Sequence, residues 1–217
     1  MYFGVKVAEV HKEYSSGKTP GGKTMLSDIE IETERLILRP PTNADLDDWA
    51  SRVFADPEVI RYLPKREMTP YERAERALRV SNENWTAHGY GGWIIRDKAD
   101  GQLVGSCDLD QEELGEVELG YCLAKAYWGK GIATETAQAV VRFAFETLKL
   151  ERLVAVVVPE NIASWRLLEN TWFIYKNKAH YYGWDVVYYG IRRDQFQSTD
   201  SFYCLHSEPP LGSEDVR

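Results

Sequence analysis

Apolar residues recur at helical spacing in two stretches of the first half of the chain. Asn43 precedes a segment with apolar residues at positions i, i+3, i+7 and i+8, and an asparagine there can cap a helix that ends at residues 56–57. These apolar residues are Leu46, Trp49, Val53 and Phe54. The sequence Thr-Pro-Tyr-Glu at 69–72 has the capping-box pattern with proline at the first helical position. It predicts a second helix that runs to His88 and ends at Gly89.

The later segments show the alternating or continuous apolar patterns that are typical of β-strands. The predicted strands cover residues 93–96, 103–109, 116–123, 153–158, 172–176 and 186–192. Asp100-Gly101 favours a hairpin between the first two, and Gly183 a hairpin between the last two. The strand at 153–158 is apolar on both faces, which is typical of the interior of a sheet. We therefore expect a mixed α/β fold, with a mostly antiparallel central sheet and helices on both faces.

Composition narrows the class of protein. The 217 residues suit one domain with tails, and the content of 44% hydrophobic and 12% aromatic residues suits a packed core. No apolar run approaches the roughly 20 residues that cross a bilayer, so no membrane partner is expected. Three widely spaced cysteines and the lack of a secretory signal pattern favour a cytoplasmic location. The net charge of −8 disfavours nucleic acid as a partner.

Polar and glycine- or proline-rich stretches mark both ends of the chain. Residues 1–28 predict a polar extension, residues 29–197 a single catalytic domain, and residues 198–217 a flexible acidic tail. Neither end is expected to carry catalysis, and docking or partner binding is the alternative interpretation of each.

The stretch Trp-Gly-Lys-Gly-Ile-Ala-Thr-Glu at 128–135 carries the clearest chemical signal. Its two glycines stand between a predicted strand and a predicted amphipathic helix, whose first amides have no intrahelical partner. Glycine lets a ligand approach the backbone, and the positive end of the helix dipole favours an anion. The spacing matches neither the dinucleotide fingerprint nor the nucleoside-triphosphate P-loop. A tight turn without a ligand is the alternative interpretation.

The order of these features resembles the GCN5-related N-acetyltransferase (GNAT) family, and in particular its RimJ/RimL-like branch. The acetyl-CoA signature of the family is Q/R-x-x-G-x-G/A, and its positions are held here by Trp128, Gly131 and Ala133. Further similar segments, in family order, are residues 33–39, 56–59, 117–121 and 160–164. The resemblance spans about residues 31–196 and implies a sheet whose central strands splay around the pantetheine arm of the cofactor.

The resemblance also implies acetyl-CoA as the acyl donor and indicates which residues would hold it. Strand backbone is expected to contact the pantetheine arm at Tyr121, Cys122 and Leu123, without their side chains. The residues expected around the pyrophosphate are Trp128, Gly129, Lys130, Gly131, Ile132, Ala133 and Thr134. Trp128 replaces the Gln or Arg donor of the signature. Asn161 is expected to contact the pantetheine arm, to cap the helix that follows it, or both.

Transfer of an acetyl group to an amine needs a neutral amine and a stabilised oxyanion. At pH 7 an α-amine with a pKa of about 7.8 is roughly 14% neutral, whereas a lysine amine is only about 0.04% neutral. From the resemblance, Glu118 is the first candidate for the base and His180 the second, since an imidazole titrates in the useful range. A carboxylate that faces solvent and a surface histidine are the alternative interpretations.

The leaving thiolate needs a proton, and the family supplies it from the tyrosine of an L-Y-E-K-x-G-F segment. Residues 167–173 read Leu-Leu-Glu-Asn-Thr-Trp-Phe, so this tyrosine is absent. Ser164 is the substitute donor that the RimJ/RimL-like branch implies, with Tyr175 as a weaker candidate and a capping serine as the alternative. Trp172 replaces the family glycine, and it either fills space near the cofactor arm or demands a different backbone.

Two functions follow from these residues. The first is an acetyl-CoA-dependent N-acetyltransferase that acts on a primary amine, in a protein N-terminus or a small molecule, by direct attack in a ternary complex. The second is an acyl-CoA-binding sensor or partner protein with weakened catalysis. Homodimers are common in the resembled branch, so a homodimer is compatible with this reading. The histidine and cysteine spacing implies no metal.

Overall fold

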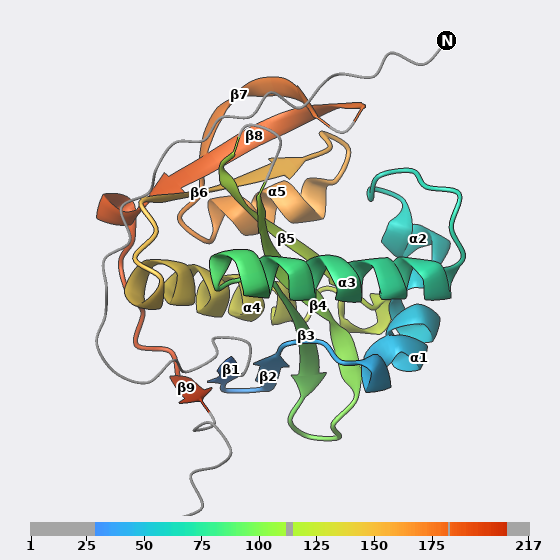
Figure 1. The fold of residues 1–217 in the computed structure, drawn as a ribbon. Helices are drawn as coiled ribbons and strands as arrows, with labels where there is room; N and C mark the ends of the chain where they lie inside the picture. Colours follow the sequence, from blue (N-terminus) through green and yellow to red (C-terminus); the bar gives the residue numbers. More distant parts are fainter. Residues whose placement is uncertain (1–28, 112–114, 182, 208–217) are drawn as a thin grey trace, which may run out of the picture.

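The sheet runs through the whole molecule. The computed structural model describes residues 29–111, 115–181 and 183–207, in which nine strands form one sheet in the order β7-β8-β6-β5-β4-β3-β2-β1-β9 (Figure 1). The strands are β1 Ile29–Thr33, β2 Leu36–Arg39, β3 Gly92–Asp97, β4 Leu103–Gln111, β5 Val117–Leu123, β6 Arg152–Val157, β7 Ile174–Tyr181, β8 Trp184–Arg192 and β9 Tyr203–Ser207. The described pairs are antiparallel except for β5 with β6, which is parallel. The predicted fold class is confirmed.

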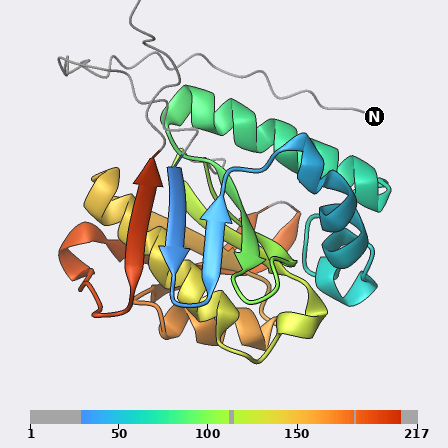
Figure 2. The same cartoon turned by 90° about the horizontal axis from the view of Figure 1, so that it is seen from below.

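Helices cover both faces of this sheet. They are α1 Leu46–Trp49, α2 Pro57–Ile60, α3 Pro70–His88, α4 Ile132–Arg142 and α5 Ile162–Glu169. Figure 2 shows α3 along one side of the sheet and α4 on the other. Successive side chains of a strand face opposite ways, so Ile94 packs with α1 and α3 whereas Trp93 packs against Phe143 after α4. Trp85, near the C-terminal end of α3, also packs on Trp93 and reaches this second cluster. Apart from that end of α3, the sheet separates an α1–α3 layer from an α4–α5 layer.

The ends of α3 follow from local sequence. The Thr69 hydroxyl accepts a hydrogen bond from the Glu72 amide at 3.2 Å, and the Glu72 carboxylate accepts one from the Thr69 amide at 2.7 Å. Gly89 ends the helix with a φ of 73°. Both predicted ends are confirmed. The cap predicted at Asn43 is wrong, because Thr42 holds that place and its amide donates to Asp45 at 2.8 Å.

A buried carboxylate ties the first helical segment to the sheet. Asp45 is fully buried and accepts hydrogen bonds from Arg39 at 2.6 Å and from Arg96 at 2.8 Å. Burial alone would raise the pKa of Asp45, but the bonds from the two guanidinium groups outweigh it and hold the pKa at about 2. This network fixes α1 to β2 and β3.

Part of the predicted tail belongs to the sheet. Residues 203–207 form β9, which pairs with β1 in five aligned positions from Ile29 with Ser207 to Thr33 with Tyr203. The prediction of a flexible tail is therefore wrong for these residues. The physical reason is that β1 would otherwise present unpaired backbone groups at its outer edge. The predicted extension at 1–28 and the tail residues 208–217 lie outside the described residues.

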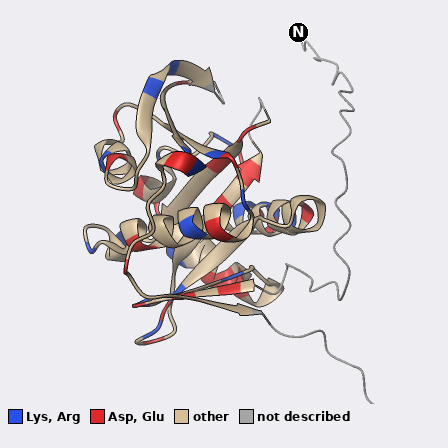
Figure 3. Ribbon diagram, turned by 90° about the vertical axis from the view of Figure 1, so that its left-hand side faces the viewer, with Lys and Arg blue, Asp and Glu red and all other residues tan. Residues whose placement is uncertain are grey.

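Charges of both signs are spread over the described ribbon. Figure 3 shows Lys and Arg positions mixed with Asp and Glu positions along the helices and strands. No helix among the described residues is both long enough and apolar enough to span a membrane.

Candidate active site

The site begins where β5 and β6 part. In the described sheet these strands share one aligned pair, Glu118 with Val154, whereas β5 and β4 share seven. Beyond that pair, residues of both strands line a cavity of about 1020 Å³ that also reaches α3, α5 and the loop before α4. Ligand cavities typically measure about 300–1000 Å³, so this one can hold a large ligand or two small ones. The predicted splay of the central strands is confirmed.

The glycine loop enters the cavity at the start of α4. Gly129 and Gly131 have φ values of 71° and 75°, a left-handed backbone that favours glycine. A Cβ would meet nothing within 4 Å at Gly129, and at Gly131 only the Arg35 guanidinium, 3.5 Å away. The space above the loop is therefore open to an anion that binds the first amides of α4.

Two loop side chains take other roles. The indole N–H of Trp128 donates to the Leu123 carbonyl at 2.9 Å and so ties the loop to the end of β5. The Lys130 ammonium lies over the Tyr127 ring, 5.5 Å from its centroid, and Lys130 does not line the cavity. Apart from Lys130, all the residues expected around the pyrophosphate line the cavity; they are Trp128, Gly129, Gly131, Ile132, Ala133 and Thr134.

The turn between β1 and β2 holds this loop in place. The Glu135 carboxylate accepts hydrogen bonds from the Thr33 hydroxyl at 2.7 Å and from the Arg35 Nε at 2.6 Å. Arg35 also donates to the Lys130 carbonyl at 2.9 Å. Burial would raise the pKa of Glu135, but these bonds outweigh it and lower the pKa. The ionised carboxylate thus connects the turn to the first turn of α4.

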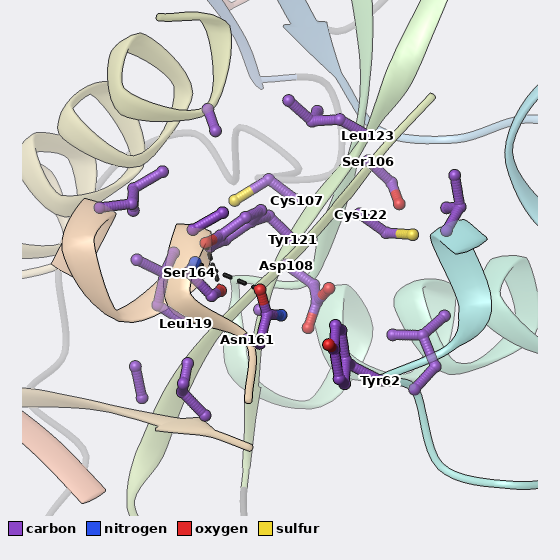
Figure 4. A pocket seen from close by; sticks show the side chains of 18 of the residues that line it. Tyr62, Ser106, Cys107, Asp108, Leu119, Tyr121, Cys122, Leu123, Asn161 and Ser164 are labelled. Atoms are coloured by element: carbon purple, nitrogen blue, oxygen red, sulfur yellow. Dashed lines mark hydrogen bonds between the residues drawn. The ribbon is translucent and has the colours of Figure 1, made fainter. Parts of the chain in front are cut away.

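A hydroxyl pair lines the cavity on the α4–α5 face of the sheet. The Tyr121 hydroxyl lies 2.5 Å from the Ser164 hydroxyl, and either can be the donor (Figure 4). Asn161 caps α5, because its side-chain oxygen accepts from the Ser164 amide at 3.3 Å. Burial raises the pKa of Tyr121 to about 12, against the hydrogen bond to Ser164, which lowers it. The phenol therefore keeps its proton at neutral pH.

Three carboxylates share the opposite face. Cross-strand partners point the same way, so the pairs Asp108 with Gly120 and Asp110 with Glu118 bring these acids together on the α3 side. All three line the cavity, and Figure 4 shows Asp108 on the side of Tyr62. Burial, with a contribution from the charge of Asp110, raises the pKa of Asp108 to about 7.

Glycine at position 120 makes room for the Asp108 carboxylate. A Cβ at Gly120 would lie 2.7 Å from one Asp108 oxygen and 3.1 Å from the other. Within the described residues, no hydrogen bond or ion pair joins the Asp108 carboxylate to another side chain. The carboxylate is thus held by packing and left available to a ligand in the cavity.

Comparison with known proteins decides the family. Residues 35–174 match the family model described as "Acetyltransferase (GNAT) domain". The chain belongs to the GNAT family of acetyltransferases. Enzymes of this family use acetyl-CoA.

Individual relatives agree with this assignment. "Uncharacterized N-acetyltransferase p20" of Bacillus licheniformis is 33% identical over 146 residues, which cover 66% of this chain and 81% of that protein. "Probable N-acetyltransferase YjcK" of Bacillus subtilis is 44% identical over 135 residues, which cover 60% of this chain and 68% of that protein. In fold, the chain is similar to Mycobacterium smegmatis RimJ in complex with CoA-disulfide, with a TM-score of 0.67, 22% identity, and coverage of 79% of this chain and 91% of that one.

Some predicted site residues of this GNAT acetyltransferase lie elsewhere. His180 is not among the cavity-lining residues; its side chain is 67% exposed at the β7–β8 hairpin and pairs with Asp185 at 2.9 Å. Trp172 is also absent from the cavity lining, and its ring packs on Phe196 with centroids 5.3 Å apart. Its φ of 67° is the left-handed conformation that glycine adopts readily. The structure therefore supports neither effect predicted for Trp172. No candidate metal-binding cluster was found within the described ranges.

Sequence reasoning missed two side chains that line the candidate site. Tyr121 was expected to act through its backbone, yet its side chain reaches Ser164. Asp108 was not considered at all, although the alternation Asp108-x-Asp110 already places two carboxylates on one strand face. The cross-strand register with Glu118, which sequence alone does not give, is what collects the three acids in one cavity.

Proposed function

We propose that this protein is an acetyl-CoA-dependent N-acetyltransferase that acetylates a primary amine by direct attack within a ternary complex. The observation that carries the proposal is that one cavity joins three features: the open glycine loop, a protonated hydroxyl pair on one face of the sheet and a carboxylate cluster on the other. Amide formation needs an anchored donor, a proton acceptor and a proton donor, and these features supply all three.

The donor is expected to bind between the loop and the parted strands. The amides at Gly131 and Ile132 would hold the pyrophosphate, and the edges of β5 and β6 would accompany the pantetheine arm. Bound in this way, acetyl-CoA supplies the thioester carbonyl. The hydrogen bonds of Arg35 to the Glu135 carboxylate and to the Lys130 carbonyl, here called the Arg35–Glu135 clamp, hold the glycine loop in position before acetyl-CoA binds.

Asp108 is proposed as the base that accepts the proton of the acceptor ammonium, with Glu118 beside it on the same face. A carboxyl with a pKa near 7 is matched to this task at neutral pH, because it is partly ionised there and is a stronger base than an ordinary aspartate. The cluster of Asp108, Asp110 and Glu118 also favours the binding of a cationic amine.

The hydroxyl pair is proposed to return a proton to the leaving thiolate. Tyr121 remains protonated at neutral pH, and Ser164 lies close enough to relay a proton or to orient the phenol. Ser164 thus keeps the acid role expected from the family resemblance, now shared with the Tyr121 side chain. The missing family tyrosine therefore does not favour the acyl-CoA-binding sensor.

Transfer through an acetylated cysteine is less suited to this site than direct attack. Cys122 lines the cavity, but burial and the nearby charge of Asp108 raise the pKa of its thiol to about 12. A thiol of that pKa is protonated at neutral pH and is a poor nucleophile. The amine itself is therefore the proposed nucleophile.

The test is release of CoA from acetyl-CoA by the purified protein in the presence of alkylamines, amino acids and short peptides. We expect turnover with at least one amine, a fall of about 100-fold or more in kcat/KM for Asp108→Asn, and smaller falls for Glu118→Gln and Tyr121→Phe. Asp194→Asn, at an exposed turn after β8, is the control and should keep wild-type activity. Tight acetyl-CoA binding without transfer to any amine would favour the sensor instead.

A further inference from the structure

A group of arginines lines the same cavity on the side of α3. Arg66 lies in the segment before α3, and Arg73 and Arg76 lie on its first two turns. Arg73 and Arg76 are half-buried. In the described part of the chain, none of the three forms an ion pair with a carboxylate. The wall of the cavity therefore holds guanidinium groups that no carboxylate of the described residues pairs with directly, and Arg76 is attracted only over a longer range by Asp110 and Glu83.

The arginines are held close together in spite of their like charge. The Arg73 guanidinium donates to the Arg66 carbonyl at 2.8 Å, which fixes the segment before α3 against the helix. Burial, together with repulsion from Arg66 and Arg79, lowers the pKa of Arg76 and outweighs the attraction of Asp110 and Glu83. An anion bound among these groups would relieve the repulsion and accept the N–H groups that face the cavity.

The arginine group and the carboxylate group line different parts of the same cavity. Arg76 precedes Asn84 by eight residues on α3, and Asn84 donates to Asp110 at 2.8 Å. Eight residues correspond to about 12 Å along a helix, and the long arginine side chain shortens this span. A small molecule can therefore place a cationic amine at the carboxylates and an anionic group at the arginines.

The segment before α3 also partly closes this space. The Tyr62 hydroxyl donates to the Glu160 carbonyl at 3.3 Å, and the Lys65 ammonium lies over the Trp184 ring, 5.5 Å from its centroid. These contacts reach from the α2–α3 segment to the start of α5 and to β8. A cover of this kind favours a compact acceptor over a folded protein surface.

The phosphates of CoA are not the expected occupant of the arginine group. The glycine loop that would hold them opens α4 on the other layer of the molecule, whereas the arginines belong to the α3 layer with Asp108 and Asp110. The donor and the arginines thus approach the gap between β5 and β6 from opposite faces.

We propose that the acceptor is a small primary amine that also carries an anionic group, a carboxylate or a phosphate, which Arg66, Arg73 and Arg76 bind while the amine faces Asp108. This inference rests on the proposed acetyltransferase function. It specifies the substrate class, because an amine without an anionic group leaves the arginines unneutralised, and a second ammonium in its place would be repelled by them.

The experiment measures kcat/KM for acceptors that differ only at the end remote from the amine. Amines of two to six carbons are compared with a terminal carboxylate, phosphate, neutral amide or second ammonium. For at least one chain length, an anionic acceptor is expected to exceed its neutral counterpart by about tenfold or more. The carboxylate and phosphate series separate the two sources of negative charge.

Variants then assign the preference to the arginines. Arg76→Gln and Arg73→Gln should lower kcat/KM for the anionic acceptor by about tenfold to a hundredfold and affect the neutral amide much less. Arg79→Gln is the matched control, because Arg79 lies on the same helix, is 61% exposed and pairs with Glu83 outside the cavity. Calorimetry with acetyl-CoA should give similar affinity for all variants.

The other possible outcomes of these experiments each contradict a different part of the proposal. An equal or higher rate with neutral or diamine acceptors, or a preference that survives in the arginine variants, contradicts the inference while leaving the transferase function intact. Loss of acetyl-CoA binding in the arginine variants would assign these groups to the donor instead. Preference for a peptide N-terminus over every small amine would contradict the compact acceptor. No transfer to any amine would contradict the proposed function itself.

Discussion

Replacement of Asp108 by asparagine is expected to make the protein more stable above pH 7 and, at the same time, less active. Burial and the charge of Asp110 raise the pKa of this carboxyl to about 7, from an ordinary value of 3.8. The folded state therefore holds its proton to a higher pH than the unfolded state does. It follows that the free energy of unfolding falls as the pH rises from about 4 to about 7, because Asp108 ionises in the unfolded state at a lower pH than in the folded state.

The size of the effect follows from this difference in pKa. A gap of about three pH units corresponds to an upper bound of about 4 kcal/mol, because each unit is worth about 1.4 kcal/mol. At pH 5 the loss of stability corresponds to about one pH unit of this gap, and at pH 8 it corresponds to the whole gap. The Asp108 side chain is partly accessible to solvent, so the actual loss of stability is expected to be smaller than this upper bound. We expect the stability gain of Asp108→Asn to be about 1–2 kcal/mol larger at pH 8 than at pH 5.

Urea unfolding of the wild type and the variant at pH 5 and pH 8 measures this difference, and CoA release measures the loss of activity. Asp185→Asn is the control, because that carboxylate is 95% exposed and should show no comparable gain at high pH. A stability difference for Asp108→Asn that stays constant between the two pH values would refute the raised pKa. Full activity in the variant would refute the role of Asp108 as the base.

Three further changes test separate parts of the structure. Gly120→Ala puts a Cβ within 2.7 Å of an Asp108 oxygen and should lower kcat/KM by about tenfold to a hundredfold with little change in acetyl-CoA affinity; unchanged kcat/KM would argue against Asp108. Glu135→Gln removes the charged bond to Arg35 and should weaken acetyl-CoA binding about three- to tenfold by calorimetry, whereas wild-type affinity would show that the clamp is dispensable. Asp45→Asn removes the carboxylate that Arg39 and Arg96 share and leaves Arg96 only a 3.8 Å contact with Asp48, so urea unfolding at pH 7 should show a loss of about 2–4 kcal/mol. Because the pKa of Asp45 is about 2, its contribution is present above about pH 4 and declines toward pH 2, so a loss of equal size at pH 7 and pH 2.5 would contradict the network.

The elements that sequence predicted well are those with strong local signals. The α3 ends are set by Thr69 and Gly89, which act on their own backbone neighbourhood, so no distant contact is needed to predict them. The β9 strand was missed for the opposite reason. It exists because residues 203–207 pair with β1, which lies far away in the chain, and the local pattern of this segment does not reveal such a partner.

The candidate site shows the same division. The glycine loop and the Asn161 cap are local motifs and were found, whereas the Tyr121 and Ser164 hydroxyls meet across 43 positions of sequence. The raised pKa of Asp108 depends on burial and on the cross-strand register of β4 and β5. Trp172 shows that a residue type can mislead, since the chain there keeps a left-handed backbone without glycine.

The central claim is that the glycine loop holds acetyl-CoA, and calorimetric titration with acetyl-CoA tests it most directly. Gly131→Glu puts bulk and negative charge into the loop, and Gly101→Glu is the matched control, because Gly101 also has a positive φ but lies outside the cavity. We predict binding to the wild type and to Gly101→Glu, and none to Gly131→Glu. Equal binding to all three proteins, or to none of them, would contradict the account.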